Sequence, residues 1–197
     1  MIDATTKEIV ASMPFGDYPT EIATSPDGNK VYVINSGSNT ISVIDTAINN
    51  VTGNVSVGDG PSDIAVSPDG TNIYVTNWRS NNVSVINAAT NNVTTTIPVG
   101  LTPFGVAITP DGKKVYVANS AIYSSGYEDN VSVIDTVTNK VTATVNTRKY
   151  TMNCPTGVVI GPSVRDGNES SKSNSIPGFG LFGSLVCLHA GQRLRKK

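Results

Sequence analysis

Three aspartates at a fixed interval are the first residues in this sequence that could do chemistry. Asp27, Asp69 and Asp111 each stand between a proline and a glycine, and they are 42 residues apart. Carboxylates that converge on one point can hold Ca²⁺, so a ring of these side chains is one interpretation. Pro-Asp-Gly is also typical of a tight turn in which the aspartate bonds to nearby backbone, and one carboxylate per repeat is not a cluster. We therefore expect a structural role for all three and no metal site.

The sequence contains only one histidine and two cysteines. The single histidine, His189, lies outside the repeats, so the sequence predicts neither an imidazole metal site nor a serine–histidine nucleophile. Cys154 and Cys187 lack the spacing of a metal-binding or redox motif, and we expect both to be unpaired. No catalytic residue and no cofactor is predicted, which indicates a protein that is not an enzyme.

The aspartates belong to a longer repeat whose period decides the fold class. Pro19, Pro61 and Pro103 open three units at intervals of 42 residues, inside the window of about 40–45 residues that is typical of four-stranded propeller blades. In the second unit, four segments rich in β-branched residues cover 64–67, 72–77, 82–86 and 93–99. The sequence therefore predicts an all-β protein, a β-propeller of four-stranded antiparallel blades.

Turn residues separate these predicted strands. The sequence Ser/Thr-Pro-Asp-Gly between the first and second strands places proline where φ is near −65° and glycine where a positive φ is needed. Before the fourth strand, an asparagine suits a left-handed backbone: Asn49, Asn91 or Asn139. The residue that ends the third strand should shape the same turn: Asp45, Asn87 or Asp135.

The second strand of each unit carries a family signature. Val31-Tyr32-Val33-Ile34 and Val115-Tyr116-Val117-Ala118 are apolar at every position, which is typical of strands buried on both faces. Tyr74-Val75-Thr76-Asn77 matches the Tyr-Val-Thr-Asn signature in full. With the flanking Pro-Asp-Gly and Val-Ser-Val-Ile-Asp segments, the chain resembles the YVTN family of propeller repeats. The resemblance implies a closed propeller, commonly seven-bladed, found often in archaeal surface-layer proteins.

The predicted propeller covers residues 1–162 and is an open or incomplete ring. Complete blades are expected at 19–60, 61–102 and 103–154, with partial blades at 1–18 and 155–162, whereas closed propellers need about 4–8 blades. Either the two terminal pieces combine into one defective blade, or the chain is an open arc that pairs with other copies, or it is a fragment of a longer product. The absence of a signal peptide and of a start-like context favours a fragment.

The last quarter of the chain departs from the repeat. Residues 163–175 are polar and read as a linker. Residues 176–197 combine Pro177-Gly178-Phe179, an apolar run too short to cross a bilayer as a helix of about 18–20 residues, and a basic end. This order resembles the PGF-type sorting signal of archaeal surface proteins, which implies cleavage and lipid attachment. Polar residues interrupt the run, so the signal is degenerate or the reading frame shifts near Cys187; a disordered basic tail is the alternative.

Sequons for N-glycosylation would suit an exported chain. They occur at Asn50, Asn54, Asn82, Asn92, Asn130 and Asn168. In a chain so rich in asparagine, serine and threonine, several arise by chance, so they support export only weakly.

A candidate binding rim follows from two insertions in the third unit. Six extra residues lie between Asn119 and Val131, and four more precede Pro155. In a meandering blade, the loop between the second and third strands emerges on the same face as the connection to the next blade, so aromatic and charged side chains should gather there. The rim comprises Trp78, Arg79, Tyr123, Tyr127, Glu128, Asp129, Arg148, Lys149 and Tyr150. The alternative is a surface loop without a ligand.

Charge and composition complete the functional expectation. The formal charge is −1. Because the tail at 176–197 is basic, the rest of the chain is mildly acidic and has no basic patch that would indicate nucleic-acid binding. We expect a non-enzymatic structural or adhesion protein of the cell surface, attached to membrane only through its tail. Its partners would be other envelope proteins or glycans, or further copies that complete the ring. The alternative is an enzyme or cofactor-binding propeller, a lactonase-like hydrolase.

Overall fold

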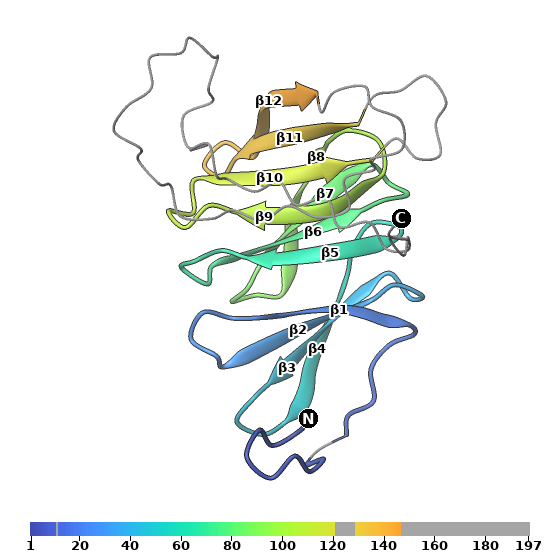
Figure 1. Ribbon diagram of the computed structural model, residues 1–197, viewed down its shortest axis with the longest axis vertical. Helices are drawn as coiled ribbons and strands as arrows, with labels where there is room; N and C mark the ends of the chain where they lie inside the picture. Colours follow the sequence, from blue (N-terminus) through green and yellow to red (C-terminus); the bar gives the residue numbers. More distant parts are fainter. Residues whose placement is uncertain (11, 121–128, 147–197) are drawn as a thin grey trace, which may run out of the picture.

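The described part of the chain consists of three four-stranded antiparallel sheets. The computed structural model describes residues 1–10, 12–120 and 129–146, and these ranges contain twelve strands and no helix (Figure 1). The first sheet holds β1 (Pro19–Thr24), β2 (Lys30–Asn35), β3 (Thr40–Asp45) and β4 (Asn50–Ser56). The second holds β5 (Pro61–Val66), β6 (Asn72–Asn77), β7 (Asn82–Asn87) and β8 (Asn92–Pro98), and the third holds β9 (Pro103–Ile108), β10 (Lys114–Asn119), β11 (Asn130–Asp135) and β12 (Lys140–Asn146). The predicted all-β class with three complete blades is confirmed.

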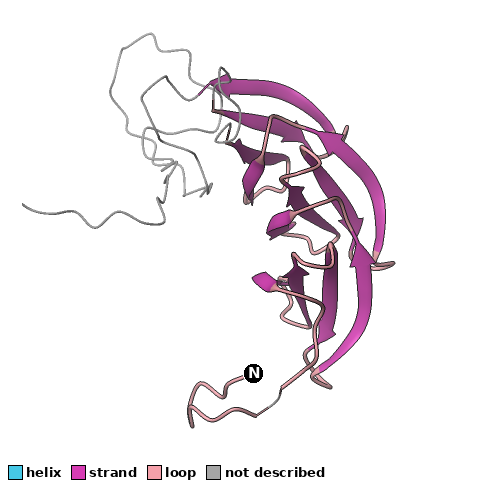
Figure 2. Ribbon diagram, turned by 90° about the vertical axis from the view of Figure 1, so that its right-hand side faces the viewer, coloured by secondary structure: helices cyan, strands magenta, loops and turns pink. Residues whose placement is uncertain are grey.

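Each sheet is a simple meander, and the sheets stack face to face. Strands adjacent in sequence pair with one another, and β1, β5 and β9 lie side by side where the sheets meet. Figure 2 shows the three sheets following one another in an arc. Because each sheet has the same order, the same two types of loop recur on each side of the arc.

The Pro-Asp-Gly turns have the predicted conformation. In the second blade the Gly70 amide donates to the Ser67 carbonyl oxygen at 2.8 Å. The glycines have positive φ angles of 73°, 71° and 70°, at Gly28, Gly70 and Gly112. A side chain at these positions would be strained, since only glycine adopts a positive φ at no steric cost.

The turns between the third and fourth strands also follow the prediction. Their asparagines are left-handed, with φ of 51°, 57° and 53° at Asn49, Asn91 and Asn139. In the first blade, Oδ1 of Asp45 accepts from the Ala47 amide at 2.8 Å, and Asn87 accepts in the same way in the second blade. These side chains cap the turn, which is why asparagine and aspartate can replace one another there.

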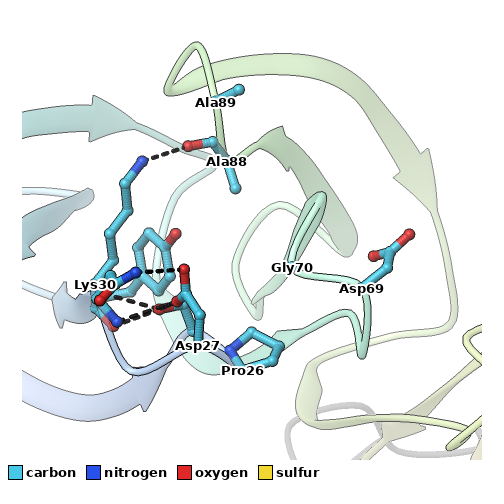
Figure 3. Close-up of a pocket in the computed structure, with 10 residues that line it drawn as sticks. Pro26, Asp27, Lys30, Asp69, Gly70, Ala88 and Ala89 are labelled. Atoms are coloured by element: carbon cyan, nitrogen blue, oxygen red, sulfur yellow. Dashed lines mark hydrogen bonds between the residues drawn. The ribbon is translucent and has the colours of Figure 1, made fainter.

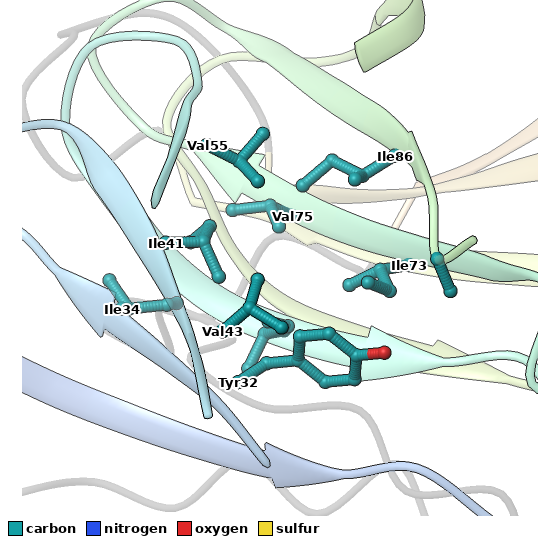
Figure 4. Close-up of a cluster of buried hydrophobic side chains, with 10 residues drawn as sticks. Tyr32, Ile34, Ile41, Val43, Val55, Ile73, Val75 and Ile86 are labelled. Atoms are coloured by element: carbon teal, nitrogen blue, oxygen red, sulfur yellow. The ribbon is translucent and has the colours of Figure 1, made fainter. Parts of the chain in front are cut away.

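The hydrophobic core lies between the sheets. Tyr32, Ile34 and Val43 of the first sheet pack against Ile73 and Val75 of the second (Figure 4). Burying one such side chain stabilises a fold by about 1.5–3 kcal/mol. This packing supplies the main cohesion between blades.

Strand β6 shows why its sequence is apolar at successive positions. Val75 and Ile73 belong to the cluster against the first sheet, whereas Tyr74 belongs to a second cluster with Val115 and Val117 of the third sheet. Successive side chains on a strand point to opposite faces. The central sheet is therefore buried on both faces, as its sequence predicted.

The asparagine that ends the second strand anchors a buried polar network. Asn77 is fully buried, and its amide donates to Ser84 Oγ at 2.9 Å and to Asn82 Oδ1 at 2.8 Å. Gly58, in the connection from the first blade, packs directly on this amide, because a Cβ there would lie 2.7 Å from it. Asn35 and Asn119 form the same bonds to serine in the other blades, at 2.9 and 2.8 Å. The network ties each blade to the connection that enters it.

Residues 1–10 form a turn built like those between third and fourth strands. Ile2 pairs with Ile9 in an isolated antiparallel bridge, and Asp3 Oδ1 accepts from the Thr5 amide at 2.7 Å. Lys7 takes the left-handed conformation with φ of 62°. The predicted partial blade at 155–162, the linker at 163–175, the tail at 176–197, both cysteines and His189 lie outside the described residues. Within the described ranges, no helix is long and apolar enough to span a membrane.

Candidate functional site

The loop after the second strand and the connection between blades meet on one face. The Trp78 amide donates to the Gly60 carbonyl oxygen at 2.8 Å, and the Arg79 amide donates to the Asp59 carbonyl oxygen at 3.2 Å. These bonds fix the β6–β7 loop against the connection from β4 to β5. The structure therefore places the candidate rim around Trp78 where loop and connection support each other.

Trp78 lies at the boundary between the second and third blades. Its ring stacks on Phe104 of β9, with ring centroids 6.2 Å apart and planes inclined by 14°. The guanidinium carbon of Arg79 lies 4.7 Å from the centroid of the Trp78 ring, within range of a cation–π contact. Gly60 leaves room for the indole, because a Cβ at that position would lie 2.6 Å from Nε1. A cation, an indole and a phenyl ring thus form one contact group across two blades.

Polar contacts extend this group toward the first blade. Arg79 and Asp59 form an ion pair of 3.9 Å, and both side chains are more than half exposed, at 59% and 54%. Solvent screens such a pair, so it orients the guanidinium more than it stabilises the fold. The Asn39 side chain donates to Asp59 Oδ1 at 3.0 Å and accepts from the Gly60 amide at 3.0 Å. Side chains from three consecutive blades therefore contribute to this rim.

The structure brings together only part of the candidate rim. Trp78 and Arg79 are adjacent, and Asp129 lies half-buried just before β11. The other candidates lie outside the described residues: Tyr123, Tyr127, Glu128, Arg148, Lys149 and Tyr150. Phe104 also belongs to the stack, although it was not predicted from the sequence. It could have been found as an aromatic residue at a position of the repeat that holds Thr20 and Ser62 in the other two blades.

The repeated aspartates lie on the opposite face and shape their turns. Asp27 Oδ1 accepts from Ser25 Oγ at 2.5 Å and from the Asn29 amide at 3.1 Å. The serine hydroxyl, followed by the Asn29 amide, lowers the pKa of the Asp27 carboxyl. Asp69 and Asp111 are held in the same way, and each has a lowered pKa. Among the described residues, no group of three or more histidine, cysteine, aspartate or glutamate side chains could hold a metal ion.

One carboxyl group on the first strand of a blade is different. Asp63 of β5 is half-buried, and its two oxygens accept from the Ile64 and Val106 amides at 2.8 Å each. Burial is the main cause that raises the pKa of this carboxyl, to about 6, and the two amides oppose it. Glu21 of β1 adds a smaller electrostatic contribution in the same direction as burial. Since Val106 belongs to β9, Asp63 links the second and third blades.

Comparison with known proteins identifies the architecture. Residues 3–97 match the family model described as lactonase, 7-bladed beta-propeller. The solved structure of hydrazine synthase from Kuenenia stuttgartiensis is 32% identical over 79% of this chain, with a TM-score of 0.68. Both matches agree with the observed stack of four-stranded antiparallel sheets. The described blades have the fold of an incomplete β-propeller.

More distant propellers agree on the fold alone. The structures of U3-55K and of the RRP9 WD40 repeats each cover 67% of this chain with a TM-score of 0.58, at 14% and 15% identity. The chain spans 43% of the hydrazine synthase chain and about 40% of the two others, which is less than half the length of each. Among curated proteins, no sequence matches the chain.

The propeller architecture also explains some of the sequons. Asn82 and Asn130 open the third strand of their blades, are half-buried, and accept hydrogen bonds from Asn77 and Asn119 at 2.8 Å. Their Asn-Val-Ser sequence therefore serves the buried network, and these side chains are poorly placed for a glycan. The sequon asparagines on the outer strands are exposed: Asn50, Asn54 and Asn92. Asn168 lies outside the described residues.

Proposed function

We propose that this propeller is a non-enzymatic binding protein of the cell surface, which contacts envelope proteins or glycans through the rim around Trp78 and Arg79. The observation that carries the proposal is the stack of Arg79 and Trp78 on Phe104. Tryptophan and arginine are the residues most enriched at binding hot spots. Here they are held by a neighbouring blade, so little side-chain entropy is lost when a partner binds.

The polar groups that recur in every blade also support a scaffold. In Asp27, Asp69 and Asp111, the Oδ1 atom of the carboxylate accepts from hydroxyl and amide donors of its own turn. Asn35, Asn77 and Asn119 donate to buried serines. Side chains in these roles maintain the architecture. Residues that differ between blades, such as Trp78, would then provide binding specificity.

The proposal is tested by cosedimentation of the purified chain with cell-envelope fragments. Arg79→Ala removes the exposed cation without changing the core, and we expect binding to weaken by about tenfold or more, as at a hot spot. Lys140→Ala is the matched control, because Lys140 is also exposed but lies at the start of β12, away from the rim. Equal binding by the Arg79 variant and the wild type would refute a role for this rim. Prior digestion of the fragments with protease or glycosidase separates protein from glycan partners.

Surface location rests on the tail, whose residues lie outside the described ranges. The order of Pro177-Gly178-Phe179, apolar run and basic end supports attachment of the chain to membrane. Fractionation of cells that express the whole chain or a chain ending at residue 175 tests this point. Recovery of both forms in the same fraction would argue against an anchor.

A hydrolase is the second candidate function, because residues 3–97 match a lactonase family model. Sugar-lactone hydrolysis should be measured with and without divalent metal ions. Turnover that depends on the metal and survives Arg79→Ala would favour this alternative and refute the binding proposal.

A further inference from the structure

Two pockets recur at the boundaries between blades, on the face of the Pro-Asp-Gly turns. The first has a volume of about 410 Å³ and lies between the first and second blades (Figure 3). The second has a volume of about 280 Å³ and lies between the second and third blades. Asp69 lines both, and the pockets are built from equivalent positions of the repeat. They differ in one cation.

The first pocket contains an ammonium group that the chain itself provides. Lys30 of β2 extends across the blade boundary, and its Nζ donates to the Ala88 carbonyl oxygen at 2.7 Å (Figure 3). Tyr32 and Asp27 line the same pocket. A lysine side chain therefore already occupies this environment once in the molecule.

The second pocket lacks that cation. Asn72 replaces Lys30, and its short side chain donates to Thr71 Oγ1 at 3.0 Å. Thr136 stands at the position equivalent to Ala88, and no lysine or arginine lines the pocket. Asp69 and Asp111 both line it, and their Oδ2 atoms accept no hydrogen bond from the part of the chain that the structure describes. The lining of the pocket is therefore acidic and has free acceptor atoms, although Lys113 lies near enough to Asp111 to help lower the pKa of its carboxyl.

The hydroxyl group of Tyr74 also faces the second pocket. Tyr74 is 1% exposed, and its ring belongs to the apolar cluster between the second and third sheets. The same side chain lines the pocket, and within the described residues its hydroxyl makes no hydrogen bond but is open to solvent from the pocket. Burial, and then the Asp69 carboxylate, raises the pKa of this hydroxyl, so it stays neutral near pH 7. The Tyr74 hydroxyl is therefore open to a ligand that enters the pocket.

We propose that the second pocket binds a primary alkylammonium group, such as the side chain of lysine, in the position that Lys30 occupies in the first pocket. Carboxylates, a phenol oxygen and a backbone carbonyl are the acceptors that a three-donor ammonium uses. The rings of Pro68 and Pro110 line the pocket and can cover the alkyl chain. A volume of about 280 Å³ suits a single side chain better than a larger ligand. The site is independent of the rim, which lies on the other face.

The probe is n-butylamine, which is an ammonium ion near pH 7, titrated into the ¹⁵N-labelled whole chain. We expect saturable shifts in the amide signals of Asp111, Gly112 and Thr136, and none with 1-butanol, which has the same alkyl chain but no charge. Nα-acetyl-lysine methylamide forms a second arm. Binding of both amines indicates that a lysine side chain of a partner can enter, and binding of n-butylamine alone indicates a free amine. Saturable shifts with butanol, or none with either amine, would overturn the proposal.

Three variants separate the site from a general electrostatic effect. Asn72→Lys supplies the ammonium internally and should weaken amine binding by about tenfold or more. Lys30→Asn empties the first pocket and should add a second set of shifts, near Gly70 and Ala88. Tyr74→Phe removes a hydroxyl that makes no hydrogen bond to the residues that the structure describes, so it should leave the unfolding midpoint unchanged while weakening binding by about threefold to tenfold. Unchanged amine affinity in both Asn72→Lys and Tyr74→Phe would refute the assignment.

Discussion

Replacing Asp63 by asparagine should remove most of the dependence of stability on pH between about pH 4 and about pH 7. Asp63 is the carboxyl on the first strand of the second blade that accepts from the Ile64 and Val106 amides, and its pKa is raised from 3.8 to about 6. Burial is the largest cause, because it disfavours the ionised form. The folded chain therefore binds the proton of Asp63 more tightly than the unfolded chain does.

The sign and size of the effect follow from this pKa. A carboxyl whose pKa rises from 3.8 to about 6 on folding contributes at most about 3 kcal/mol to the free energy of unfolding, because each pKa unit corresponds to about 1.4 kcal/mol. That contribution is fully present below pH 3.8 and is lost as the pH rises through about 6. About 2 kcal/mol of it should disappear between about pH 4 and about pH 7. The lowered pKa values of Asp27, Asp69 and Asp111 act in the opposite direction, and only at more acidic pH.

Urea unfolding at a series of pH values measures this effect through the single tryptophan. Trp78 stacks on Phe104 across the boundary that Asp63 spans, so its fluorescence reports on those two blades. At acidic pH the free energy of unfolding of the asparagine variant should be about 1 kcal/mol below that of the wild type, because its side-chain amide offers one acceptor to two backbone amides. The stability of this variant should then vary little with pH. Glu21→Gln is the control, since it removes a charge that raises the Asp63 pKa and should move the transition to lower pH. Parallel pH profiles for the wild type and Asp63→Asn would refute the reasoning.

Further predictions concern the connections that enter the second blade. Gly58→Ala should destabilise the chain by about 1–3 kcal/mol, because the new Cβ would lie 2.7 Å from the buried Asn77 amide; Gly53→Ala, where the nearest atom is 3.6 Å away, should change the denaturation midpoint little. Asn77→Ala should cost about 1–3 kcal/mol, since it leaves a buried serine and asparagine without their donor, and an unchanged midpoint would contradict a structural role. Gly60→Ala combines a φ of 68° with a contact of 2.6 Å to the indole, so it should displace Trp78 and shift its emission maximum; an unaltered spectrum would show that the ring does not rest there.

Most of the architecture could be predicted because it depends on local chemistry. Gly70 has the positive φ that a Pro-Asp-Gly turn requires, and Asn91 has the left-handed conformation expected before the fourth strand. The apolar character of successive residues in β6 correctly indicated burial on both faces, since Tyr74 and Val75 belong to different clusters. These features need only a residue and its neighbours in sequence.

Contacts between blades were harder to predict because they depend on strand register. The pairing of β5 with β6 is irregular between Pro61 and Asp63, and this shift is not visible in the sequence. The Asp63 carboxylate reaches the Val106 amide, and Phe104 reaches the Trp78 ring, across a boundary between sheets. The sequon at Asn82 is a further example, because its sequence resembles a glycosylation site while its side chain completes a buried network.

The Pro-Asp-Gly turns suggest how the gene for such a chain gains or loses repeats during evolution. The Pro26 ring lies 3.5 Å from the Cβ site of Gly70, and the Pro68 ring lies 3.6 Å from that of Gly112. Both pairs are 44 residues apart. A tandem duplication of one 42-residue unit in the gene would therefore create a new proline–glycine neighbour pair identical to the existing ones. Unequal recombination could add or delete a module of this kind without any compensating mutation at the seam.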